Sequence, residues 1–119
     1  MKKSYGELRK WGCDVDGALE RVVGDEELYR DCLQSIARDE AFFALGDALR
    51  AGDVGRAFDH AHTLKGVLAN LGLTPLYDIV VRIVEPLRVK SADGVMEEYK
   101  KLLAARQRLE TMIKVMSTK

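Results

Sequence analysis

The stretch FDHAHTLKGVLANLG, residues 58–72, decides the fold, because it carries an uninterrupted helical pattern together with both histidines of the chain. Small and apolar residues recur there, and just before it, at steps of four and three: Ala57, Ala61, Leu64, Leu68 and Leu71. A helix with this spacing buries one face against other helices of a bundle. Asp53 is predicted to open the helix, which is predicted to end near Gly72.

The same helical spacing extends toward the N-terminus, and no strand-like alternation appears. Two short helices are predicted over residues 4–11 and 14–23, with Leu8 and Trp11 of the first facing inward. Asp25 is predicted to cap the segment that follows. Its apolar residues recur at helical spacing: Leu28, Cys32, Ile36, Phe42, Leu45 and Leu49. This segment is either one long helix or two helices joined near residues 38–39.

Two further helices are predicted after Gly72. Thr74 is the expected N-cap of the first, with Pro75 at its first helical position. Pro86 is expected to kink or end it. Asp93 is the expected cap of the final helix. The inward residues of the two helices are Leu76, Ile79, Ile83 and Leu87, and then Val95, Tyr99, Leu102, Leu109, Ile113 and Met116.

Four long helical segments joined by short turns predict an all-α fold, an antiparallel up-down four-helix bundle with short N-terminal helices packed against it. A different all-α packing is the alternative. With 119 residues, the chain is expected to form one domain over residues 1–119. The core looks self-sufficient, so a monomer is expected.

Composition limits the function classes. Lys and Arg together number 19, as do Asp and Glu, which argues against a strongly basic surface for nucleic acid, although it leaves a local basic patch open. No apolar run is long enough to span a membrane, and the start shows no signal peptide. Cys13 and Cys32 lack metal-binding spacing, so we expect reduced cysteines in a cytoplasmic protein, with a disulfide as the alternative.

The two histidines are predicted to face different directions. On a helix of 3.6 residues per turn, His62 lies roughly 140° from the middle of the buried face and His60 only about 60° from it. Residues two apart do not face each other on a helix, so no metal site is expected on this pair. His60 is predicted to be a partly buried histidine that fills space beside the core and caps a polar group.

The face of His62 has the composition of a reactive site. It also carries Gly55, Phe58, Lys65, Gly66 and Ala69. A neutral imidazole is a competent nucleophile near neutral pH, and the Lys65 ammonium can reach an anion carried on that ring. Glycine inside a helix costs about 1 kcal/mol relative to alanine, and at Gly66 it would let another protein approach the backbone. The alternative is an ordinary solvated helix face.

Residues 61–72, AHTLKGVLANLG, resemble the signature of histidine-containing phosphotransfer (HPt) domains. That signature is A-H-[ST]-L-K-G followed after a few residues by N-[LI]-G. The segments ALERVVGDEELYRDCL (18–33), LRAGDVGRAFDHAHTLKG (49–66) and RIVEPLR (82–88) are also similar to the family. The resemblance extends over residues 15–116.

The resemblance implies a four-helix bundle in which His62 is the phosphorylated residue, Lys65 stabilises the phosphoryl group and Gly66 clears the approach. Such domains carry phosphoryl groups between receiver-domain aspartates, and the receiver supplies the Mg²⁺. The implied partners are response-regulator receiver domains and a hybrid or chemotaxis-type histidine kinase. The chain has no segment for binding ATP, so no autokinase activity and no cofactor of its own are expected.

Gly55, Phe58 and Ala69 are the predicted docking residues. Phe58 is either an apolar anchor for the partner or a packing residue against the N-terminal helices. Two other functions stay open: a helical module that binds receivers without phosphotransfer, and an excised phosphotransfer domain of a chemotaxis-type kinase.

Overall fold

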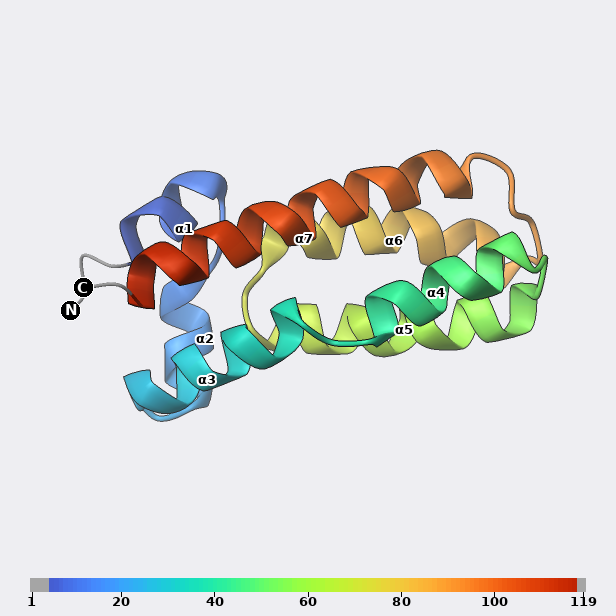
Figure 1. The fold of residues 1–119 in the computed structure, drawn as a ribbon. Helices are drawn as coiled ribbons and strands as arrows, with labels where there is room; N and C mark the ends of the chain where they lie inside the picture. Colours follow the sequence, from blue (N-terminus) through green and yellow to red (C-terminus); the bar gives the residue numbers. More distant parts are fainter. Residues whose placement is uncertain (1–4, 118–119) are drawn as a thin grey trace.

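The computed structural model describes residues 5–117, and the side chains of residues 5–116, as an all-helical chain (Figure 1). The helices are α1 (Gly6–Trp11), α2 (Val15–Arg21), α3 (Glu26–Ala37), α4 (Ala41–Arg50), α5 (Val54–Asn70), α6 (Thr74–Arg88) and α7 (Val95–Ser117). No helix in the described range combines the length and apolar character needed to cross a bilayer.

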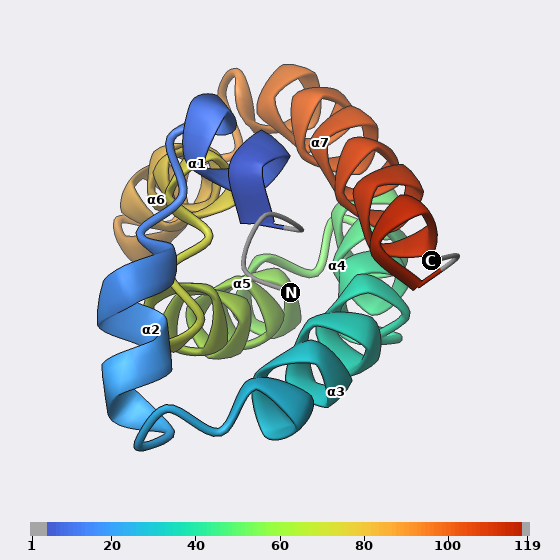
Figure 2. The same ribbon diagram turned by 90° about the vertical axis from the view of Figure 1, so that its left-hand side faces the viewer.

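The predicted up-down bundle is confirmed. α3 and α4 follow one another along one side of the molecule, and α5, α6 and α7 form the other three rods. Figure 2, along the bundle, shows the four rods arranged around a shared core. α5 packs against α4 and α6, while α7 packs against α6 and α3. Each rod runs antiparallel to its neighbours, because the connections between consecutive rods are short.

The short helices α1 and α2 lie at one end of the bundle (Figures 1 and 2). Leu8 is buried there and Trp11 is half-buried, with the Arg108 guanidinium carbon 4.6 Å from a Trp11 ring centroid. The prediction that the second helix runs to residue 23 was wrong. α2 ends at Arg21, and Val23 has a positive φ of 56° and is 92% exposed. The N–H groups of Val23 and Gly24 instead satisfy carbonyls of the last helical turn.

The segment before α5 is two helices, broken at residues 38–40. Asp25 caps α3 as predicted, since its carboxylate accepts a hydrogen bond from the Leu28 N–H. At the break, the Asp39 carboxylate accepts from the Ala41 N–H at 2.7 Å. Arg106 of α7 donates to the carbonyl of Ala37 at 2.8 Å. A side chain from another helix therefore satisfies a carbonyl at the end of α3.

The buried face of α3 agrees with the predicted apolar spacing at Ile36 but not at Leu28 and Cys32. Tyr29, Leu33 and Ile36 point into the core, whereas Leu28 is 46% exposed and Cys32 is half-buried. The hydroxyl of Tyr29 donates to the carbonyl of Leu71 at 3.2 Å, at the end of α5. At Leu28 and Cys32 the buried positions are thus shifted by one residue, about 100° around the helix, to Tyr29 and Leu33, and burying the large tyrosine ring removes more apolar surface than burying Leu28.

α5 and α6 begin and end close to the predicted positions. The Asp53 carboxylate accepts from the Arg56 N–H, and Gly72 follows α5 with a φ of 68°. Thr74 is not the N-cap of α6, because the buried Leu73 occupies that position and no side chain caps the helix. Pro86 lies inside α6, which ends two residues later at Arg88.

The inward stripes of α6 and α7 are confirmed except at two positions. Ile79 and Met116 are only half-buried, and Val80 and Val84 complete the buried face of α6. Tyr99 is buried in α7, and its hydroxyl donates to the carbonyl of Phe42 at 2.8 Å. Cys13 is buried, Cys32 is half-buried, and both are free thiols.

Candidate functional site

α5 turns its two histidines to different sides of the bundle. Ala57, Ala61, Leu64 and Leu68 are buried, so they fix the inward direction of the helix. His62 is exposed, and His60 is half-buried. Because this divergence follows from the helical geometry, the two imidazoles do not form a joint site.

His60 lies on the side of α5 that faces α4. It lines a small cavity of about 300 Å³ with Asp47, Ala48, Asp53 and Arg56, among others. Within residues 5–117, no hydrogen bond or ion pair involves its side chain. The predicted capping role is therefore not seen, and two of the neighbours of His60 pair with each other, since Arg56 lies 4.0 Å from the Asp53 carboxylate.

The His62 imidazole lies against an aromatic ring. The centroids of the His62 and Phe58 rings are 5.6 Å apart, with the planes tilted by 31°. The guanidinium carbon of Arg88, from α6, lies 5.5 Å from the Phe58 centroid. Arg88 also pairs with Glu85 at 3.5 Å. α5 begins at Val54, at the end of the bundle opposite the N-terminal helices α1 and α2 (Figure 1), so Phe58, near its start, does not pack against them.

Lys65 and Gly66 occupy the next turn of α5. Lys65 is half-buried, and it forms no ion pair with any residue that the structure describes. Helical side chains lean toward the N-terminus of their helix, so the Lys65 stem leans toward the turn that carries His62. A free ammonium placed in this way is suited to an anion on the imidazole.

Gly66 is exposed, and its place in α5 has no explanation in the packing of the chain. A Cβ built at Gly66 meets no atom within 4 Å. Gly46, in the middle of α4, behaves differently, because a Cβ there would clash with the ring and hydroxyl of Tyr99. Gly55 and Ala69 are also exposed on α5. Small residues thus leave the backbone beside His62 accessible.

Comparison with protein families identifies this arrangement. The model of the Hpt domain family matches residues 26–117. The chain belongs to the Hpt domain family. No curated protein and no solved structure matches the chain. The matched residues cover α3 to α7, so the match begins after α2, whereas the resemblance seen in the sequence begins near Val15.

Membership of the Hpt family implies histidine phosphotransfer in a phosphorelay of two-component signalling. Hpt domains are phosphocarriers rather than kinases, and they interact with receiver domains and histidine kinases. In the described residues, no group of three or more His, Cys, Asp or Glu side chains could hold a metal ion.

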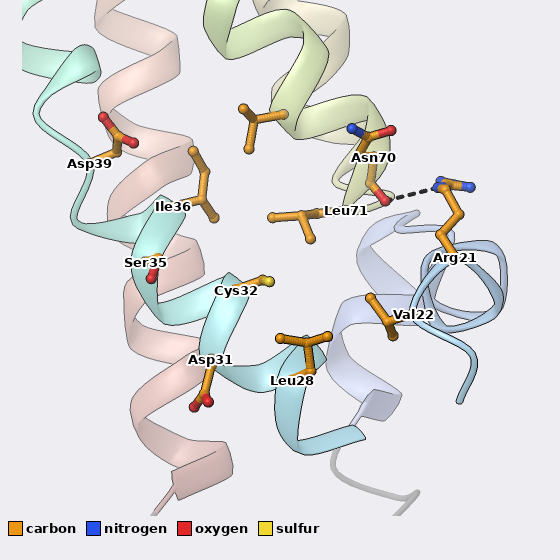
Figure 3. A pocket seen from close by; sticks show the side chains of 11 residues that line it. Arg21, Val22, Leu28, Asp31, Cys32, Ser35, Ile36, Asp39, Asn70 and Leu71 are labelled. Carbon is orange, nitrogen blue, oxygen red and sulfur yellow. Dashed lines mark hydrogen bonds between the residues drawn. The ribbon is translucent and has the colours of Figure 1, made fainter. Parts of the chain in front are cut away.

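This Hpt domain also has a groove that the sequence did not reveal (Figure 3). The groove has a volume of about 720 Å³ and lies between α2, α3 and the C-terminal half of α5. Its apolar lining consists of Val22, Leu28, Cys32, Ile36, Val67 and Leu71. Asp31 and Asp39 lie at one side, and Arg21 lies at the other, where its guanidinium donates to the carbonyls of Asn70 and Ala69.

Two parts of the site could not be found by reading the sequence. Arg88 approaches Phe58 from another helix, and Arg21 reaches the end of α5 from α2. Neither contact has a local spacing that would indicate it. The exposure of Leu28 and Val67, which opens the groove, depends on how α3 rotates against α5 and α7.

Proposed function

We propose that His62 of this Hpt domain accepts a phosphoryl group from a receiver-domain aspartate and passes it to the aspartate of another receiver. The observation that supports this most is the exposed imidazole on α5 beside a glycine whose Cβ position is empty. Lys65 stabilises the phosphoryl group, and Gly66 clears the approach. The chain acts as a phosphocarrier without a cofactor of its own, and Mg²⁺ belongs to the receiver.

The transfer needs a neutral imidazole. A lone pair on one ring nitrogen of His62 attacks the phosphorus of the aspartyl phosphate, and an N–P bond forms. The P–O bond to the aspartate breaks, and its electron pair leaves with the carboxylate. The other ring nitrogen then releases its proton to water, which removes the positive charge that the ring gained when the N–P bond formed. Lys65 balances the charge of the transferred group, and the reverse sequence delivers the group to the second receiver.

The docking surface in this proposal consists of the exposed flank of α5, with Gly55 and Ala69, and the groove between α2, α3 and α5, whereas the half-buried Phe58 packs against His62 and Arg88. The groove reaches α5 through Val67 and Asn70, which adjoin Gly66 and Ala69 in the chain. Its apolar lining suits an apolar patch on the partner. The partners are response-regulator receivers and a hybrid or chemotaxis-type histidine kinase. The domain acts as a cytoplasmic monomer.

The test is label transfer from receiver domains phosphorylated with radiolabelled acetyl phosphate. Wild type and His60→Gln should take up acid-labile label, and His62→Gln should take up none. Uptake by His62→Gln would show that the phosphorylated residue is a different one. Binding of a phosphorylated receiver without any uptake by wild type would favour the binding module that lacks phosphotransfer.

A matched set of variants tests the docking surface. Leu28→Gln and Val67→Gln should each weaken receiver binding about tenfold, because each removes an exposed apolar contact from the groove. Val115→Gln is the control, since this valine is exposed on α7, which does not line the groove. Equal affinities for all three variants would show that the groove lies outside the interface.

A further inference from the structure

The stack of Arg88, Phe58 and His62 joins α6 to the exposed histidine. Phe58 is half-buried and packs against the core, and this packing restricts the movement of its ring. The Arg88 guanidinium carbon lies 5.5 Å from its centroid, and the His62 ring lies 5.6 Å from it. Glu85, one turn before Arg88, pairs with Arg88 on the same helix. An exposed imidazole is thus held against a ring that is itself held from two sides.

The contact restricts the orientation of an exposed side chain. Phe58 is one turn before His62, and helical side chains lean toward the N-terminus, so the imidazole leans over the phenyl ring. The separation and tilt lie in the range of attractive aromatic pairs. Without the ring, His62 would sample two χ1 wells and two χ2 orientations, or about four arrangements, of which the stack selects one.

We propose that Phe58 is a positioning residue for the phosphotransfer by His62, and that Arg88 holds Phe58 in place. The inference rests on the function proposed above, and it replaces the role of Phe58 as a docking anchor. A reacting nitrogen must meet the phosphorus in a narrow geometry, so a ring that is already oriented reacts more often in each encounter. Phe58 therefore acts on the rate of transfer within the complex, not on the affinity for the receiver.

The first test reads the orientation of the ring without any transfer. The chain has two histidines, so a His60→Gln variant assigns their imidazole proton signals in an NMR spectrum. The phenyl ring current should displace the His62 signals in wild type and in Phe58→Tyr. In Phe58→Leu this displacement should disappear while the His60 signals stay unchanged. His62 signals in wild type that match those of Phe58→Leu would overturn the proposal.

Arg88 is tested against a matched arginine of the same helix. Arg88→Met should reduce the ring-current displacement at His62, because Phe58 loses the guanidinium that covers it. Arg82→Met should leave it unchanged, because Arg82 is exposed on α6 and pairs with Glu98 at 2.9 Å, away from the stack. An equal effect of the two substitutions would remove Arg88 from the mechanism.

The second test separates positioning from docking. At saturating phosphorylated receiver, transfer to Phe58→Leu should be slower by up to about fourfold, the number of orientations that the stack otherwise excludes. The half-saturating receiver concentration should stay unchanged, and Phe58→Tyr should restore the rate. A raised half-saturating concentration with an unchanged maximal rate would overturn the proposal. Wild type that takes up no label would refute the proposed function instead, whatever the NMR spectra show.

Discussion

Replacing Gly66 with alanine is predicted to stabilise the bundle and to slow phosphotransfer. Gly66 lies in the middle of α5, and a Cβ built there meets no atom within 4 Å. The new methyl group therefore causes no strain, and the helix gains the difference in propensity between alanine and glycine. The free energy of unfolding should rise by about 1 kcal/mol. The unfolding entropy expected for 119 residues converts this gain into a rise in Tm of about 4 °C.

Gly46→Ala provides a matched control with the opposite sign. Gly46 lies in the middle of α4, where the new Cβ would clash with the ring and hydroxyl of Tyr99. That hydroxyl is committed to the carbonyl of Phe42, and the ring is buried, so neither moves without losing contacts. Overpacking of this kind costs about 1–3 kcal/mol, which outweighs the gain in propensity.

Urea unfolding followed by circular dichroism measures both variants. The midpoint should rise for Gly66→Ala and fall for Gly46→Ala, with the slope m unchanged in each. Label transfer should be slower with Gly66→Ala despite its higher stability, because the methyl group stands where the receiver approaches the backbone. Lower stability of Gly66→Ala would refute our account of its packing. Higher stability with an unchanged transfer rate would show that no partner comes close to this backbone.

Three further predictions concern the charge near His62, the break before α4 and alkaline stability. Lys65→Ala should shorten the lifetime of the phosphohistidine, measured by label decay, without moving the urea midpoint. Arg106→Met should lower the free energy of unfolding by about 2 kcal/mol, because the carbonyl of Ala37 loses its hydrogen-bond donor. Urea unfolding measures this loss. Burial raises the pKa of the Cys13 thiol from 9.0 to about 11, so as the pH rises the thiol ionises in the unfolded chain before it ionises in the folded one. The free energy of unfolding should therefore fall between pH 9 and 11 by up to about 2 kcal/mol. In Cys13→Ala this pH-dependent fall should be absent when urea unfolding is measured at several pH values in that range.

The fold was predictable from the sequence where one periodic pattern dominates. The spacing of Ala57, Ala61, Leu64 and Leu68 matches the buried face of α5, and Asp53 caps that helix as predicted. In α3, two stripes of apolar residues compete, one through Leu28 and one through Tyr29. Helical spacing allows both, and the packing of α3 against α7 and the end of α5 selects the second.

The sequence by itself determined which histidine is exposed. Each residue advances about 100° around a helix, so the buried face of α5 is enough to place His62 in solvent and His60 nearer the core. Only the tertiary structure decided that Arg88 covers Phe58, that the space beside Gly66 is empty and that a groove opens between α2, α3 and α5. These features depend on how separate helices rotate and pack against one another, which no local spacing in the sequence encodes.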